Sequence, residues 1–170
     1  VANNFSFDKA KLSANPFAAM LVKSSVKSQF TAPLTFAKRE RDPFFVFKEN
    51  GLNFFLSSND TKPLHIDFLK GSMGWRLKRS DHEKLLKKTL GKSSESLCIF
   101  DGTAGLLSDT LIFLALGHKV IACEQSKILF ILLLDAIERA KDQLPFIDNL
   151  KLLNVNSTKF SYYLNNLIPF

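Results

Sequence analysis

The residues best suited to chemistry lie between Phe100 and Leu106, in the run Phe-Asp-Gly-Thr-Ala-Gly-Leu. The run follows an apolar stretch typical of a strand and precedes a stretch typical of a helix. In an open parallel sheet, ligands bind outside the carboxyl ends of the strands, where such turns lie. Gly102 and Gly105 allow a tight turn and close approach of the backbone to a ligand. The following helix N-terminus would add free N–H groups and partial positive charge.

A second acidic position narrows the class of ligand. Glu124 directly follows the next expected strand, where a carboxylate can accept hydrogen bonds from both hydroxyls of a ribose. The row from Gly102 reads G-T-A-G-L-L and lacks the third glycine of the dinucleotide fingerprint G-x-G-x-x-G. Asp101 would repel a phosphate but suits an ammonium group. These features favour S-adenosylmethionine, a cation with a ribose and no phosphate. A nicotinamide site and a turn that binds no ligand are the alternatives.

Alternating strands and helices are expected to position these residues. The pattern predicts strands at 97–100, 119–123 and 150–155, helices at 108–116 and 125–141, and a short helix at 157–164. Such alternation indicates an α/β fold with a parallel sheet and right-handed crossovers. Cys98 and Cys123 lie in neighbouring strands of this sheet and are expected to be buried free thiols.

Upstream of the sheet, we expect a connector over residues 64–80 and a helix over 81–90. Asp81 is the expected N-cap of that helix and Gly91 its C-cap. Lysines are expected on one face of the helix, and Leu85, Leu86 and Leu90 on the other. Two aromatic runs at 44–47 and 52–56, separated by Asn50-Gly51, predict a β-hairpin. The chain is therefore expected to divide into a β-rich region, 1–63, and an α/β domain, 64–170.

The net charge of +7 favours a polyanionic partner, either nucleic acid or an anionic membrane surface. A lysine-rich surface with no such partner is the alternative. If the partner is RNA, the expected contacts are Arg76, Lys78, Arg79, Lys84, Lys87 and Lys88. The scattered histidines and cysteines predict no metal site, and no apolar run is long enough for a membrane span. A cytoplasmic location is therefore expected.

Three segments resemble the ribosomal small-subunit RNA methyltransferase J family, which methylates the exocyclic amine of a guanine in 16S rRNA. The family pattern D-A-T-A-G-L-G-R-D is met by residues 101–109, and E-R-N by residues 124–126. The more specific pattern V-D-F-x-x-G-x-M-x-x-R is met by residues 66–76. The resemblance implies a Rossmann-like class I methyltransferase sheet, S-adenosylmethionine as cofactor, and rRNA or the small ribosomal subunit as partner.

The resemblance also extends the expected cofactor site. It adds Ser108, Asp109, Gln125, Asn156 and Ser157 to the residues already identified. The full expected set is Asp101, Gly102, Thr103, Ala104, Gly105, Ser108, Asp109, Glu124, Gln125, Asn156 and Ser157. Leu107 stands where the family has glycine, Ser108 where it has arginine, and Asn156 where it has serine.

The family places its catalytic D-P-x-x-P motif after a fourth strand, in a sheet of about seven strands. The first three parallel strands are expected here, and Phe170 precedes the position of the fourth. We therefore expect a fragment of a longer enzyme, with a half-enzyme that needs a partner chain as the alternative. No catalytic residue can be named within the 170 residues. A degenerate methyltransferase fold that binds RNA or a protein without catalysis is the rival interpretation.

Overall fold

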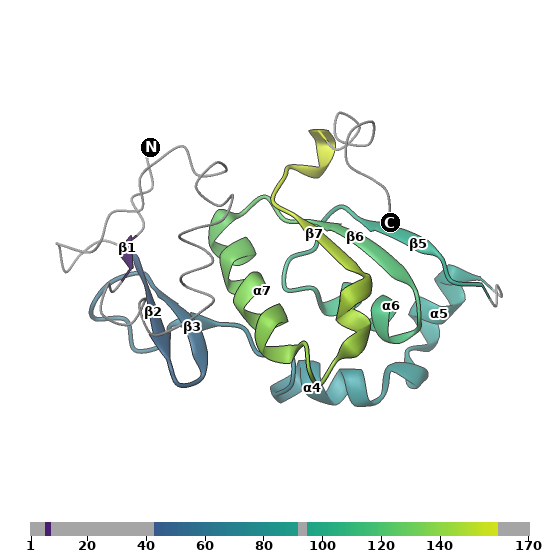
Figure 1. Ribbon diagram of the computed structural model, residues 1–170, viewed down its shortest axis with the longest axis horizontal. Helices are drawn as coiled ribbons and strands as arrows, with labels where there is room; N and C mark the ends of the chain where they lie inside the picture. The colour runs from purple at the N-terminus through teal and green to yellow at the C-terminus, as the bar shows by residue number, and fades with distance from the viewer. Residues whose placement is uncertain (1–5, 8–42, 92–94, 160–170) are drawn as a thin grey trace. The chain divides into compact units, whose positions relative to one another are not determined.

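The computed structural model describes residues 6–7, 43–91 and 95–159. The chain divides into two compact units, Val1–Ile66 and Asp67–Phe170, each with its own sheet (Figure 1). The division falls three residues beyond the expected one at residue 63. The reason is that β4 (Leu64–His65) pairs with the preceding strand and so belongs to the first sheet.

The first unit is a four-stranded sheet in the order β1-β2-β3-β4. The predicted hairpin is confirmed: β2 (Phe44–Lys48) and β3 (Gly51–Phe55) pair antiparallel. β1 (Ser6–Phe7) pairs parallel with β2, and β4 pairs antiparallel with β3. Alternate aromatic side chains of the hairpin are buried, with Phe45 and Phe54 packed at a ring-centroid distance of 5.0 Å.

The turn of the hairpin differs from the Asn-Gly turn that the sequence predicts. A type I′ turn needs positive φ at both central residues. Gly51 has a φ of 110°, but Asn50 is not among the residues with positive φ. Instead, the buried Asn53 amide donates hydrogen bonds to Asn50 Oδ1 at 2.9 Å and to the Gly51 carbonyl at 2.8 Å. A side chain from within the strand therefore stabilises the turn.

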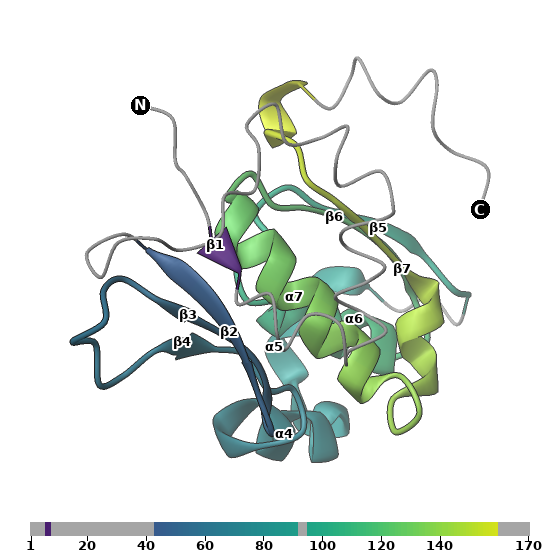
Figure 2. The ribbon, with the colours of Figure 1, turned by 60° about the vertical axis from the view of Figure 1, so that its left-hand side comes forward.

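The second unit contains the expected parallel sheet, in the order β5-β6-β7. Its strands are β5 (Cys98–Asp101), β6 (Lys119–Cys123) and β7 (Leu150–Leu153). The crossover helices α6 (Ser108–Ala115) and α7 (Lys127–Ala140) cover one face of the sheet (Figure 2). Two 3₁₀ turns, η2 (Pro145–Asn149) and η3 (Ser157–Lys159), flank β7. The rest of the helix expected at 157–164 lies outside the described residues.

The core of this unit lies between the sheet and the two helices. β6 is the central strand, and its residues from Val120 to Cys123 are buried. Leu111 and Leu114 of α6 and the run Ile131–Leu133 of α7 pack there with almost no exposed surface. Ser126 caps α7, because its side chain accepts a hydrogen bond from Leu129 N at 3.3 Å. One apolar layer thus holds all three strands in register.

The predicted connector at 64–80 is wrong, because it contains a helix, α4 (Gly71–Lys78). Two glycines and the lack of a capping side chain disfavour a helix locally, but the fold requires one of those glycines. Gly74 is buried, and a Cβ on it would clash with the Leu69 carbonyl. The close approach of the backbone, which the sequence pattern does not report, therefore explains a glycine within α4.

The helix expected at 81–90 is shorter and starts differently. A 3₁₀ turn, η1 (Ser80–His82), precedes α5 (Lys84–Leu90), so Glu83 and not Asp81 occupies the N-cap position. Gly91 ends the helix as predicted, with a φ of 80°. Leu85 is 80% exposed, so the expected leucine face is only partly formed.

Candidate functional site

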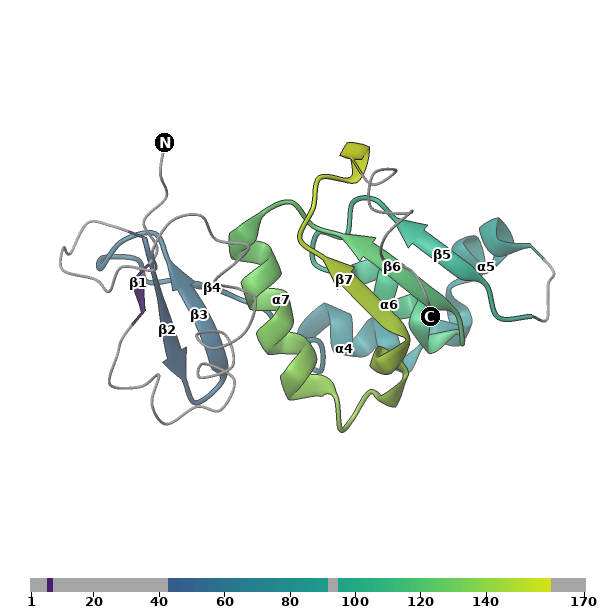
Figure 3. The ribbon, with the colours of Figure 1, turned by 45° about the horizontal axis from the view of Figure 1, so that its top comes forward.

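A cavity of about 440 Å³ lies where the three parallel strands end, within the usual range for small-molecule sites. The strands run side by side in the same direction, so their carboxyl ends share one edge (Figure 3). Seven of the expected cofactor residues line this cavity: Gly102, Thr103, Gly105, Glu124, Gln125, Asn156 and Ser157. The cavity therefore draws on loops that follow β5, β6 and β7.

Glu124 is the most informative of these residues. It is only 8% exposed although it is a polar residue, and it lines the cavity. Its Oε1 accepts a hydrogen bond from Ser126 N at 2.6 Å. Within the described part of the chain, Oε2 accepts no hydrogen bond and no cation pairs with the group. A buried carboxylate normally has partners for both oxygens, so this oxygen is suited to a ligand with hydroxyl donors.

The loop after β5 lies close to β6 and to the loop after β7. Ala104 N donates to the Cys123 carbonyl at 3.0 Å, which ties the loop to the end of β6. A Cβ added to Gly102 would lie 3.3 Å from the Cβ of Ser157, so a side chain there would enter the cavity wall. Gly105 has a φ of 50°, which confirms the tight turn expected at this glycine.

Asp101 organises this loop from the inside. Its Oδ1 accepts from Thr103 N at 3.0 Å, and its Oδ2 accepts from the buried Thr110 hydroxyl at 2.5 Å. Asp101 does not line the first cavity. It lines a second cavity of about 560 Å³ with six other residues of the expected set, of which Ala104, Ser108 and Asp109 do not line the first cavity. The loop residues Gly102, Thr103 and Gly105 line both cavities.

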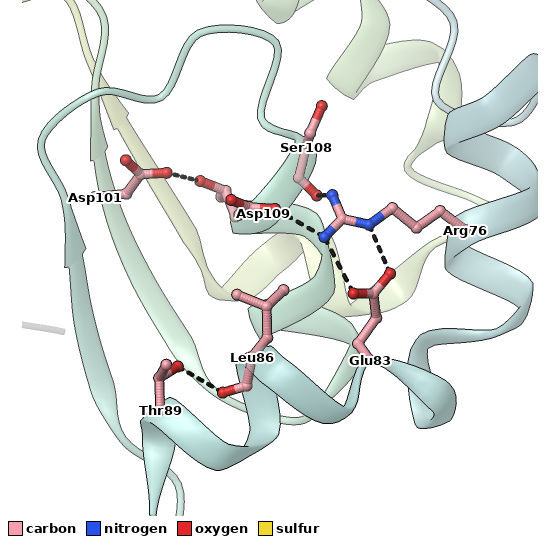
Figure 4. Close-up of polar contacts among 8 residues, drawn as sticks. Arg76, Glu83, Leu86, Thr89, Asp101, Ser108 and Asp109 are labelled. Atoms are coloured by element: carbon pink, nitrogen blue, oxygen red, sulfur yellow. Dashed lines mark hydrogen bonds and ion pairs between the residues drawn. The ribbon is translucent and has the colours of Figure 1, made fainter.

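Arg76 connects α4 and the start of α5 to the N-terminus of α6 (Figure 4). Its Nε and Nη2 donate to the two carboxylate oxygens of Glu83, at 2.6 and 3.2 Å. Nη2 also pairs with Asp109 Oδ1 at 2.8 Å, and Nη1 donates to the Ser108 carbonyl at 3.2 Å. The hydrogen bonds from Arg76 lower the pKa of Glu83, and those to Glu83 raise the pKa of Arg76. Arg76 therefore has an internal role that the sequence did not predict.

Leu107 precedes α6 with an unusual backbone. Its φ is 61° and its ψ 22°, the left-handed region that bulky residues avoid. Its side chain is fully buried. The resembled family has glycine at this position. The structure explains that preference, because the loop needs a positive φ before the helix. Here burial of the leucine offsets the backbone strain.

The cavity also contains residues that the sequence analysis missed, namely Cys123, Val155 and Thr158. Cys123 is the last residue of β6, so its position at a strand end was the available signal. Burial, and secondarily the Asp101 carboxylate, raise the pKa of its thiol. Cys98, expected to be buried, is exposed, because β5 pairs on one side only in the described sheet and alternates in burial.

The six basic residues expected to bind RNA have different environments. Arg76 is held internally, and Lys87 pairs with Asp81 at 3.1 Å. Lys78, Arg79, Lys84 and Lys88 are exposed and form no ion pair with any other described residue. These four side chains are available to a polyanion.

Neither a metal centre nor a membrane-spanning helix is found among the described residues. No group of three or more histidine, cysteine, aspartate or glutamate side chains there is arranged to hold a metal ion. No helix there has the length and apolar character needed to cross a bilayer.

The parallel sheet, its two crossover helices and the cavity at the strand ends have the arrangement of a Rossmann-like α/β domain. A family model described as "Putative SAM-dependent methyltransferase" matches residues 29–167, and the chain belongs to this family. The similarity to small-subunit RNA methyltransferases J, expected from the sequence motifs, is confirmed by the relatives below.

The relatives are proteins named ribosomal RNA small subunit methyltransferase J. The one from Desulfotalea psychrophila is 31% identical over 151 residues, which cover 83% of this chain and 58% of the relative. The one from Alcanivorax borkumensis is 35% identical over 102 residues, covering 58% and 40%. This chain thus spans less than two thirds of the length of these relatives.

A crystal structure of a SAM-dependent methyltransferase from Neisseria gonorrhoeae has the same fold. Its TM-score with this chain is 0.61 at 18% identity, and the match covers 96% of this chain and 65% of the other. The expected α/β methyltransferase fold is thereby confirmed.

Proposed function

We propose that this chain binds S-adenosylmethionine in the strand-end cavity and serves in methylation of RNA, at the N2 amine of a guanine in small-subunit rRNA. One observation carries the cofactor assignment: the buried Glu124 has a carboxylate oxygen without a partner among the described residues, inside a cavity of suitable volume. A ribose diol supplies the donors that this oxygen lacks. The family to which the chain belongs supports the same cofactor.

The residues of the site have distinct roles in this proposal. Glu124 accepts hydrogen bonds from the ribose hydroxyls. Asn156, whose Nδ2 donates to Gln125 Oε1 at 3.1 Å, lies with Gln125 and Ser157 around the adenine. Gly102 and Gly105 let the loop backbone approach the ligand closely. Asp101 keeps the loop in place through its hydrogen bonds from Thr103 and Thr110.

When bound, the cofactor supplies a methyl group that its sulfonium already activates. The protein then has to align the acceptor and exclude water. Asp101, Ser108 and Asp109 line the second cavity and not the strand-end cavity. We assign no catalytic residue to this chain.

RNA as the substrate rests on charge and on the names of the relatives. The net charge of +7 suits a phosphate backbone, as do the exposed cations Lys78, Arg79, Lys84 and Lys88, which form no ion pair within the described residues. The relatives are named as small-subunit rRNA methyltransferases. We propose that the protein acts on that RNA in the cytoplasm.

The first test is a calorimetric titration of the chain with S-adenosylhomocysteine, with NAD⁺ titrated in parallel. We expect saturable binding of the former in the micromolar range and none of the latter. A folded chain that binds neither ligand would refute the cofactor site, and preference for NAD⁺ would favour an oxidoreductase. Transfer of radiolabelled methyl groups to unmethylated small-subunit rRNA then tests the activity. Binding without transfer by the full-length protein would favour a non-catalytic relative.

A further inference from the structure

The outer surface of α4 exposes the one tryptophan of the chain. Trp75 is 62% exposed, more than any other aromatic side chain among the described residues. The Arg79 guanidinium lies over its ring, with Cζ 4.8 Å from the ring centroid, which is a cation–π arrangement. Core packing does not explain an indole this exposed, and the guanidinium leaves part of the ring surface open.

The charged side chains of α4 and of its C-cap residue Arg79 are all basic. Trp75, Lys78 and Arg79 are spaced three and four residues apart, so they share one face of the helix. The helix Gly71–Lys78 contains no acidic residue. Lys78 and Arg79 are exposed and have no ion-pair partner within the described ranges, whereas Arg76 on the same helix is fully engaged with Glu83 and Asp109.

We propose that Trp75, Lys78 and Arg79 form a stacking platform for an unpaired nucleotide of RNA. The base stacks on the open surface of the Trp75 ring, Arg79 covers the ring and contributes its charge, and Lys78 contacts a phosphate. Single-stranded nucleic acid is recognised in this way, by an aromatic side chain beside cations. In a duplex the base faces are hidden by their neighbours, so paired RNA does not fit the platform. The choice of RNA rests on the proposed function.

The chain provides its own probe, because Trp75 is the only tryptophan in 170 residues. Tryptophan fluorescence is measured during titration with a mixed-sequence single-stranded RNA decamer, with the same decamer annealed to its complement, and with inorganic polyphosphate. We expect saturable quenching by the single strand and at least several-fold less by the duplex and by polyphosphate at equal phosphate concentration. Equal quenching by all three, or none by the single strand, would overturn the platform.

Variants separate stacking from charge. Anisotropy of a labelled decamer should show affinity falling about 5- to 100-fold for Trp75→Ala, the range for loss of one stacked base. Trp75→Phe should restore most of the affinity. Arg79→Lys should weaken binding several-fold without changing the salt dependence, because lysine keeps the charge and loses the planar group. Leu85→Ala, which removes an exposed apolar side chain from α5, is the matched control and should bind like the parent.

The same preparations are titrated with S-adenosylhomocysteine. Trp75→Ala should keep the cofactor affinity of the parent, because Trp75 does not line either cavity at the strand ends. Cofactor binding without RNA-dependent quenching refutes the platform alone. Quenching without cofactor binding refutes the proposed cofactor site and leaves the platform standing. If Trp75→Ala binds the decamer as tightly as the parent, the platform is wrong.

Discussion

Replacing Glu124 with glutamine tests the cofactor site with a minimal change. Glutamine keeps the size of the side chain, and its amide oxygen can still accept from Ser126 N, the 2.6 Å partner of Oε1. The group facing the cavity then changes from a carboxylate oxygen to an NH₂ donor. A diol would lose its charged acceptor, and a hydrogen bond to a charged group contributes about 1.5–3 kcal/mol. The affinity for S-adenosylhomocysteine should therefore fall roughly 10- to 100-fold.

The assay is calorimetry at neutral pH on the parent and on two variants with the same change in charge. Glu138→Gln is the control, because Glu138 is an exposed residue of α7 that does not line the cavity. It should bind like the parent. Thermal unfolding of each variant shows whether the fold is intact. A folded Glu124→Gln variant whose dissociation constant lies within threefold of the parent's would refute the reasoning.

Three further predictions concern the residues around the site. Leu107→Ala should lower the free energy of unfolding by about 2–5 kcal/mol, because a buried side chain is lost. Leu107→Gly should be about 1 kcal/mol less destabilising than Leu107→Ala, because glycine removes the strain of a φ of 61°. Denaturant titrations in which the glycine variant is less stable than the alanine variant would contradict this. Arg76→Gln should destabilise the chain by about 1–3 kcal/mol at neutral pH. Because Arg76 lowers the pKa of Glu83 from 4.5, the pair stabilises the fold above that pH and stops doing so as the pH falls through the lowered value, so melting curves of parent and variant should converge on acidification. At pH 8, Ellman's reagent should modify the exposed Cys98 quickly. The buried Cys123, whose thiol pKa is raised, should react only after denaturation. Two rapidly reacting thiols in the native chain would show that Cys123 is not buried.

Local pattern was sufficient for much of the fold. β6 has the bounds that the sequence predicts, and α6 begins where expected and ends one residue earlier. β6 is a short apolar run, and Gly117 follows the apolar pattern of α6. Both signals lie within a few residues of the structure they specify. The helix α4 was missed because Gly71 and Gly74 disfavour a helix, and the sequence pattern does not show that the backbone at Leu69 comes too close to Gly74 for a side chain to fit.

Most of the residues that line the strand-end cavity were also predicted from the sequence. Parallel strands bring their carboxyl ends to one edge, so residues placed after each strand were expected to converge there, and Glu124, Gly102 and Ser157 do line one cavity. Sequence order did not show that Asp101 and Asp109 line the second cavity and not the first. Which cavity a side chain enters depends on the direction of the loop backbone, and that direction is determined by contacts with β6.

Sequence alone was thus enough for the order of strands and helices from β5 to β7, the glycine turn and the acidic residues at the strand ends, because each depends on short-range preferences. Tertiary structure decided the role of Arg76. The residue belongs to a basic run typical of a nucleic-acid surface, yet its guanidinium meets Glu83, Ser108 and Asp109, two of which lie more than 30 residues away. A charged side chain is internal or external according to which distant groups the fold places beside it. Trp75 lies on the same helix and Arg79 is its C-cap residue, yet their side chains are exposed and contact each other.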